Sequence, residues 1–218
     1  MTDSAFSETL QSVTERAITS FEDIHGAREL ALGECRKAIQ LASRSIRATH
    51  RGEFEEASEL VSESGTCVAR AVEALGAQPA LRNSGFLTDG EKEYAEAAIT
   101  LAFVQSSALP TLEDLNTGYA SYLNGLAEAA SELRRSALDA IRNSDTQKAD
   151  RLLSMMDEAM SVLTSVDFPE GVTGVLRRTT DQLRAVTERT RGDVTQAIRQ
   201  ASLERRLSDL ESKLGKQG

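Results

Sequence analysis

The sequence has little of what a β-rich or a disordered protein needs. It contains no Trp and only 3 Pro, and aromatic residues make up 4% of its 218 residues. Because β-sheet proteins are enriched in aromatic residues and many disordered chains are proline-rich, both classes are disfavoured. The residues that dominate instead, Ala, Leu, Glu and Arg, are typical of long helices. Composition therefore predicts an all-α fold.

Cysteine and histidine are also scarce, which excludes several kinds of metal and catalytic site. Cys35 and Cys67 form no Cys-x-x-Cys pair, and each lies in an apolar-periodic stretch, so we expect two small buried hydrophobic residues. His25 and His50 are too few for a His-rich metal site, and a di-iron bundle needs a second Glu-x-x-His motif beside Glu22–His25. Glycine-rich phosphate loops and the Gly-x-Ser-x-Gly motif are missing as well.

A surplus of basic charge is a third absence. Acidic residues outnumber basic ones by 34 to 25, which gives a formal net charge of −9. Indiscriminate DNA coating needs excess Lys and Arg, so it is disfavoured unless the basic residues are clustered. The first residues lack a leader pattern, and no stretch approaches the ~18 apolar residues of a membrane span. We expect a cytoplasmic protein with no membrane contact.

What the sequence does have is apolar residues at helical spacing, separated by short segments rich in Gly, Pro, Asn and Asp. The pattern predicts helices at about 7–49, 53–75, 88–108, 116–142, 144–164 and 172–214. We expect a kink at His25-Gly26 and a break at Gly192, and capping boxes at Thr88–Glu91 and Ser144–Gln147. Without a repeat or a long linker, residues 1–218 should form one domain, a bundle of six to seven long helices.

Carboxylates on the predicted third helix are the candidates for chemistry. Asp89, Glu93 and Glu96 are spaced i, i+4 and i+7, which places all three on one helix face. Mg²⁺ prefers oxygen ligands and can activate water against a phosphodiester. Acids at this spacing are equally typical of a solvated face, and Asp145 has the position of an acid that stabilises a helix N-terminus. From the residues alone, both interpretations stay open.

Basic residues are clustered rather than spread evenly. A stripe on the first predicted helix, here called the basic stripe, consists of Lys37, Arg44, Arg47 and Arg51, and the fourth helix carries Arg134 and Arg135. Few acids lie four residues from the stripe, so phosphate binding and a solvated face are both compatible with it.

The last predicted helix carries two further patterns. Arg177, Arg184 and Arg191 alternate with Asp181 and Glu188, which favours ion pairs within the helix. Towards its end, leucines recur at an a/d spacing suited to packing against a partner helix: Leu203, Leu207, Leu210 and Leu214.

Several short motifs occur in a fixed order along the chain. They are His25-Gly-Ala-Arg28-Glu29, His50-Arg51-Gly-Glu53-Phe, Glu93-Tyr-Ala-Glu96-Ala, Tyr122-Leu-Asn-Gly-Leu126, Ser131-Glu132-Leu-Arg134-Arg135, and Asp167-Phe-Pro169 followed by Leu176-Arg177-Arg178, Asp181, Arg184, Glu188 and Arg191. In this order the set resembles the translin/TRAX family, in its archaeal, TRAX-like form. The resemblance covers about residues 24–195 and leaves a C-terminal helical tail, 196–218, outside it.

The resemblance implies a translin-like bundle that assembles into a hollow homo-octamer with RNA or single-stranded DNA inside. In TRAX-type subunits, acids of the Glu-Tyr-x-Glu helix and a downstream aspartate bind Mg²⁺ and hydrolyse RNA, whereas translin-type subunits bind nucleic acid without that acidic set. By resemblance, Glu93, Glu96 and Asp145 are the catalytic metal ligands, with Glu132 as an additional acid. The basic stripe, with Arg134 and Arg135, would then hold the phosphates.

The leading hypothesis is therefore a Mg²⁺-dependent endoribonuclease that cleaves single-stranded RNA inside a homo-oligomer. The first alternative is a translin-like protein that binds single-stranded RNA or DNA without catalysis. The second is a structural helical oligomer or scaffold. In a hollow assembly, the net charge of −9 would average an acidic outer surface and an inner basic stripe.

Overall fold

The computed structural model describes residues 3–76, 78–82 and 84–214, and helices account for nearly all of them. Six helices are long: α1 (Asp3–Arg51), α2 (Phe54–Leu75), α4 (Gly85–Gln105), α6 (Tyr119–Arg142), α7 (Thr146–Thr164) and α9 (Leu176–Leu214). Three helices of four residues lie between them: α3 (Pro79–Arg82), α5 (Leu112–Leu115) and α8 (Glu170–Thr173). This part of the chain contains no β-strand, and the predicted all-α bundle is confirmed.

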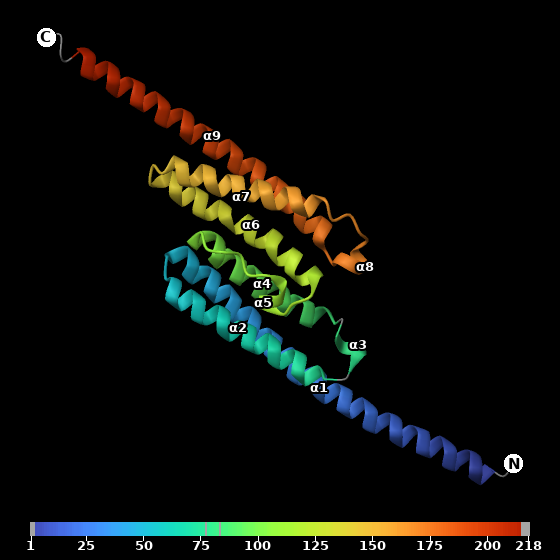
Figure 1. Cartoon of the computed structure of the whole chain (residues 1–218). Helices are drawn as coiled ribbons and strands as arrows, with labels where there is room; N and C mark the ends of the chain where they lie inside the picture. The colour runs from blue at the N-terminus through green and yellow to red at the C-terminus, as the bar shows by residue number, and fades with distance from the viewer. Residues whose placement is uncertain (1–2, 77, 83, 215–218) are drawn as a thin grey trace.

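The long helices lie side by side, with α4 and α6 in the middle (Figure 1). Helix α4 packs against α1, α2 and α6, and α6 packs in turn against α4, α7 and α9. Large side chains such as Ile99, Leu133, Met156 and Leu183 fill the main core. The chain thus forms two three-helix units, α1–α2–α4 and α6–α7–α9, which meet along α4 and α6.

At this meeting line, here called the α4–α6 seam, the two helix backbones touch. A Cβ atom placed on Gly125 of α6 would lie 2.8 Å from the Lys92 carbonyl oxygen and 2.9 Å from both Ala95 Cβ and the Glu96 amide nitrogen. Buried Ala129 lies one turn after Gly125 on the same face of α6, so a small residue continues the seam. A glycine at the closest point therefore brings α4 and α6 into direct contact.

Two predicted capping boxes are wrong, one because its glutamate binds another helix and one because a different residue is the N-cap. Helix α4 begins three residues before Thr88, at Gly85, and Glu91 Oε2 accepts a hydrogen bond from Ser121 Oγ of α6, at 2.8 Å, instead of reaching back. At α7 the N-cap is Asp145, whose Oδ1 accepts from the Lys148 amide at 2.9 Å. One capping box that was not predicted forms between Thr111 and Asp114 at the start of α5.

The predicted kink and break are also not found. Helix α1 continues through His25-Gly26, and α9 continues through Gly192. The two predicted core cysteines are confirmed, because Cys35 and Cys67 are both buried free thiols. Burial raises the pKa of the Cys35 thiol to about 11, so it stays protonated.

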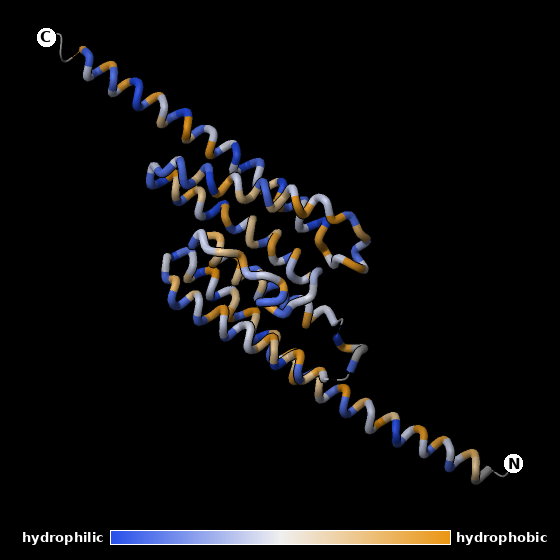
Figure 2. Tube along the Cα trace, in the orientation of Figure 1, coloured by the Kyte–Doolittle hydropathy of each residue, from blue (hydrophilic) through white to orange (hydrophobic). Residues whose placement is uncertain are grey.

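The N-terminal half of α1 and the C-terminal end of α9 project beyond the bundle in opposite directions (Figure 1). Apolar residues recur along both projecting ends (Figure 2) and are largely exposed: Phe6, Leu10, Val13, Ile18 and Phe21 on α1, and Leu203, Leu207, Leu210 and Leu214 on α9. None of the described helices combines the length and the apolar character required to cross a membrane.

Candidate functional site

Three glutamates converge on the α4–α6 seam. Glu93 and Glu96 of α4 and Glu128 of α6 each offer a carboxylate oxygen, and these oxygens lie within 4.8 Å of one another. Glu93 and Glu96 share one face of α4 because they are three residues apart, and Glu128 follows the close contact at Gly125 by the same interval. The packing of α4 on α6 thus builds this acidic cluster, as Glu93, Glu96 and Glu128 are called below.

Glu96 is the buried member of the acidic cluster, with 8% of its surface exposed. Burial raises its pKa to about 9, and the negative charges of Glu128, Glu93 and Glu132 add to the rise. At neutral pH the Glu96 carboxyl group therefore keeps its proton unless a cation compensates the charge.

Lys92 supplies part of that compensation. Its Nζ donates to both oxygens of Glu128, at 2.7 and 2.9 Å, and lies 3.0 Å from Glu93 Oε1. These hydrogen bonds raise the pKa of Lys92 despite its burial. One ammonium does not balance the charges of Glu93 and Glu128 together, and an all-oxygen donor set is the kind that Mg²⁺ prefers. The donor set therefore fits a divalent cation.

A pocket of about 450 Å³ opens beside the acidic cluster, between α4, α6 and α9. Its walls include Glu96, Glu128 and Glu132 on one side and Gln182 and Arg189 of α9 on the other. Arg189 is exposed and forms no ion pair within the described part of the chain. The pocket thus presents a cationic group opposite the carboxylates. Arg189 was not predicted from the sequence, because no helical spacing relates it to the acids of α4 and α6.

Glu132, the expected additional acid, lies one helical turn after Glu128 and makes a long-range contact. Its Oε2 is 2.7 Å from Nε2 of His50, a residue near the end of α1 whose side chain is 3% exposed. The hydrogen bond from His50 lowers the pKa of Glu132. Beside a protonated Glu96, the pocket wall therefore also carries a carboxylate held in its charged form.

The structure does not bring Asp145 to the glutamate pair. Asp145 caps α7, and α6 ends at Arg142, 14 residues beyond Glu128, which corresponds to about 21 Å of helix. The third acid at the cluster is instead Glu128. Asp89, one turn before Glu93, is exposed and also lies outside the cluster. A signal for Glu128 was present in the sequence, because it and Glu132 stand at i, i+4 in an otherwise alanine-rich stretch.

The predicted phosphate-binding residues fall into two groups. Three are paired with acids: Lys37 with Glu34, Arg51 with Glu53 and Glu56, and Arg134 with Asp193. The other three, Arg44, Arg47 and Arg135, are exposed and form no ion pair among the described residues. Arg47 donates only to Ser43 Oγ, at 2.7 Å. Among the six predicted residues, these three side chains are the ones available for an anionic ligand.

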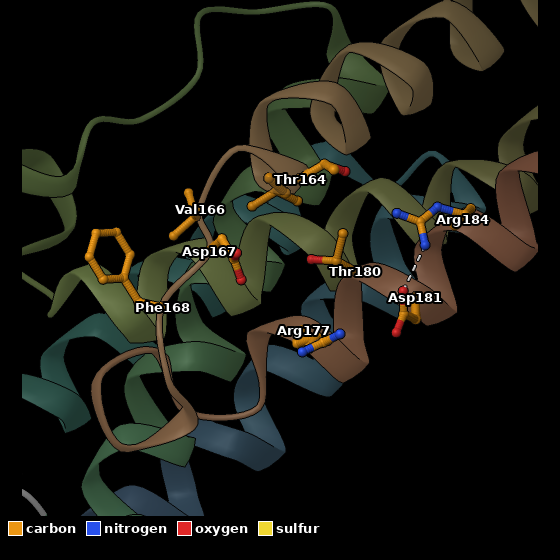
Figure 3. A pocket seen from close by; sticks show the side chains of 9 residues that line it. Thr164, Val166, Asp167, Phe168, Arg177, Thr180, Asp181 and Arg184 are labelled. Carbon is orange, nitrogen blue, oxygen red and sulfur yellow. Dashed lines mark hydrogen bonds and ion pairs between the residues drawn. The ribbon is translucent and has the colours of Figure 1, made fainter.

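Another pocket, at the turn between α7 and α9, involves the arginines of the last helix (Figure 3). Arg184 points towards Asp181 and is bound to it at 2.8 Å. Further along, Arg191 pairs with Glu188 and with Asp157 of α7. Ion pairs within the helix are thus confirmed, but each acid binds the arginine three residues after it and not, as the spacing predicted, the arginine four residues before it.

Comparison with known proteins identifies structures with the same fold. AfC3PO in complex with duplex RNA has a TM-score of 0.74 and 29% identity, covering 84% of this chain and 95% of that one. A second AfC3PO structure has the same score and identity, covering 84% and 96%. Apo-NeC3PO has a TM-score of 0.72 at 17% identity, covering 86% and 96%, and this likeness concerns the fold.

Sequence comparison adds a weaker likeness. An uncharacterised protein of Methanocaldococcus jannaschii is 28% identical over 124 residues, which are 56% of this chain and 55% of the relative. The match thus spans about half the length of that relative. No family model matches the sequence.

The bundle has the fold of the C3PO structures. The motifs of the sequence resemble the translin/TRAX family, and the likeness to the solved C3PO structures supports this resemblance. In fold and in these motifs, the chain is similar to the translin/TRAX family.

Proposed function

We propose that this protein is a Mg²⁺-dependent endoribonuclease that works as a homo-oligomer. The observation that carries the proposal is the acidic cluster, in which carboxylates from two helices come within 4.8 Å of one another. Glu93, Glu96 and Glu128 would hold the cation. Glu128 takes the place that the sequence analysis gave to Asp145.

When bound, Mg²⁺ would neutralise phosphate charge and lower the pKa of water. The chain's own residues prepare for this in several ways. Lys92 holds the carboxylates of Glu93 and Glu128 in place, and Glu96 releases its proton to solvent when a cation enters. Arg189, across the pocket, would bind a phosphate oxygen.

The ligand we propose is RNA, with single-stranded RNA as the substrate and single-stranded DNA as a second ligand. The solved AfC3PO complex contains duplex RNA, which supports an RNA ligand for a chain of this fold. The exposed guanidinium groups of Arg44, Arg47 and Arg135 would bind phosphates. The chain has few aromatic residues on which bases could stack, so binding should depend strongly on salt.

The homo-oligomer is supported by the projecting ends of α1 and α9. A side chain such as Phe6 or Leu207 is exposed in the single chain, and burying it fully against a partner contributes about 1.5–3 kcal/mol. From the family resemblance we propose a hollow octamer, with the basic stripe inside and the acidic surplus outside.

Cleavage of labelled single-stranded and duplex RNA, in Mg²⁺ and in EDTA, tests the proposal. We expect the wild type to cleave only with Mg²⁺, and the Glu93→Gln/Glu96→Gln variant to lose cleavage while retaining RNA binding. Asp89→Asn and Asp145→Asn are matched controls, because each removes one acid outside the acidic cluster, and both should cleave like the wild type. Undiminished cleavage by the double variant would refute the site.

One observation favours binding without catalysis as the second candidate. Lys92 Nζ already bridges Glu93 and Glu128, so the lysine ammonium group can take the place of a divalent metal ion. If the protein binds RNA but does not cleave it with any divalent cation, this second function is selected. A scaffold function would show neither RNA binding at low salt nor cleavage.

A further inference from the structure

The contact between His50 and Glu132 joins residues 82 positions apart and reaches from the end of α1 to α6. His50 is 3% exposed at its side chain, and its Nε2 lies 2.7 Å from Glu132 Oε2. A charge-assisted hydrogen bond of this length, donated by a buried ring to a carboxylate whose side chain is 38% exposed, fixes the orientation of that carboxylate.

The second ring nitrogen of His50, Nδ1, does not hold another residue in place. His50 Nδ1 is buried and has no hydrogen-bond partner among the described residues. Buried polar atoms without partners are uncommon, because they lose their bonds to water. Core packing alone would be served as well by an apolar side chain. The Nε2 contact with Glu132 is therefore what distinguishes His50 from a hydrophobic residue here.

Glu132 stands beside the acidic cluster without belonging to it. It lines the same pocket as Glu96 and Glu128, but it is not among the carboxylates that lie within 4.8 Å of one another. Its negative charge still contributes to the raised pKa of Glu96. Glu132 is thus close to the place where a cation would be held, and outside the set that would hold it.

Only one oxygen of Glu132 is occupied. His50 binds Oε2, while Oε1 makes no hydrogen bond within the described part of the chain. The titratable and charged groups around Glu132 are His50 of α1, Glu96 of α4, Glu128 and Arg135 of its own helix and Arg189 of α9. A carboxylate held at one oxygen and open at the other is the arrangement that a general base requires.

We infer that His50 is a positioning residue that holds Glu132 as the general base for the attacking water. The inference rests on the proposed function and names Glu132 as the proton acceptor of the cleavage reaction. Glu132 Oε1 takes a proton from water as the water oxygen bonds to phosphorus. The bond from phosphorus to the leaving ribose oxygen breaks, and that oxygen keeps the electron pair and takes a proton from solvent. The proton on Glu132 then returns to solvent.

The test compares four variants of the full chain: His50→Leu, His50→Gln, Glu132→Gln and the combined His50→Leu/Glu132→Gln. A glutamine amide at position 50 can reach where Nε2 stands and donate the same hydrogen bond. Thr49→Val is the matched control, because Thr49 is buried next to His50 on α1 and its hydroxyl bonds only to Ser45 O, at 2.9 Å.

We expect Glu132→Gln to lower kcat at least ~100-fold and His50→Leu at least ~10-fold, with KM for RNA and the Mg²⁺ midpoint changed less than about twofold. His50→Gln should stay within about threefold of wild type, and Thr49→Val should match it. The combined variant should be no slower than Glu132→Gln, because His50 acts through Glu132. In EDTA without RNA, the changes in thermal midpoint caused by His50→Leu and Glu132→Gln should not add up to the change in the combined variant.

Several outcomes overturn the inference. An active wild type with an equally active His50→Leu removes it and leaves the proposed function intact. Additive rate losses would show that His50 does not act through Glu132. A raised Mg²⁺ midpoint in His50→Leu would make Glu132 a metal ligand rather than the base. A wild type that binds RNA without metal-dependent cleavage removes the inference and the proposed catalysis together.

Discussion

Replacing Gly125 with alanine should separate the two helices that build the acidic cluster. The added Cβ would lie 2.8–2.9 Å from Lys92 O, Ala95 Cβ and Glu96 N, and two of these atoms belong to the α4 backbone. Backbone atoms cannot rotate away as a side chain can. Restoring ordinary contact distances therefore requires α4 and α6 to move apart by roughly 0.5–1 Å, which typically costs about 1–3 kcal/mol.

The intrinsic preference of helices for alanine opposes this cost by about 1 kcal/mol. Gly33→Ala is the matched control, because Gly33 lies inside α1 and an added Cβ would meet nothing within 4 Å. The helix preference is the same in both variants. Gly125→Ala should therefore be about 1–3 kcal/mol less stable than Gly33→Ala by urea unfolding, or melt several degrees lower.

The separation should also weaken cation binding. Mg²⁺ requires near-ideal ligand distances, and Glu96 and Glu128 lie on opposite sides of the α4–α6 seam. We expect the Mg²⁺ concentration for half-maximal cleavage to rise about tenfold in Gly125→Ala and to stay unchanged in Gly33→Ala. If Gly125→Ala is as stable as the control and has the same Mg²⁺ midpoint, the close approach at Gly125 does not position the site.

Three further predictions concern charge and assembly. Between pH 5 and pH 9 without metal, unfolded Glu96 loses a proton that folded Glu96, with a pKa of about 9, retains, so stability should fall as pH rises. Glu96→Gln should lack most of this dependence of the unfolding free energy on pH. At pH 8 with EDTA, its free energy of unfolding in urea should exceed that of the wild type by about 1–3 kcal/mol. The same pH dependence in both proteins would contradict the burial argument. Arg44→Ala/Arg47→Ala should weaken RNA binding and reduce the slope of log affinity against log salt by about 1.4, and an unchanged slope would exclude both phosphate contacts. Leu207→Ser/Leu210→Ser should lower the oligomer mass in light scattering at unchanged helix content, whereas an unchanged mass would exclude this end of α9 from the interface.

The helices were predictable because their signals are local. Apolar residues at helical spacing mark every long helix, and α2 begins and ends within a residue or two of the predicted range. Helix ends were less predictable where a neighbouring helix decides them. Thr88–Glu91 reads as a capping box, but Ser121 of α6 provides a better partner for Glu91, and α4 begins earlier.

The candidate site was predictable to the extent that it lies on one helix. Glu93 and Glu96 share a face by spacing alone, and the structure brings them together. Glu128 comes from another helix, and its place depends on how closely α6 approaches at Gly125, which no local pattern encodes. Asp145 was assigned by a match carried across a loop, and it caps α7 instead. The contact of His50 with Glu132 spans 82 positions and has no signal in the sequence.

The division of the chain into two three-helix units has a thermodynamic consequence. The acidic cluster draws Glu93 and Glu96 from one unit and Glu128 from the other, so a cation held there fastens the units to each other. A ligand at 100 times its dissociation constant stabilises the state that binds it by about 2.7 kcal/mol. This stabilisation would act against sliding or parting of the units rather than against fraying within either one. Metal occupancy should therefore appear first in slower amide exchange along the facing sides of α4 and α6.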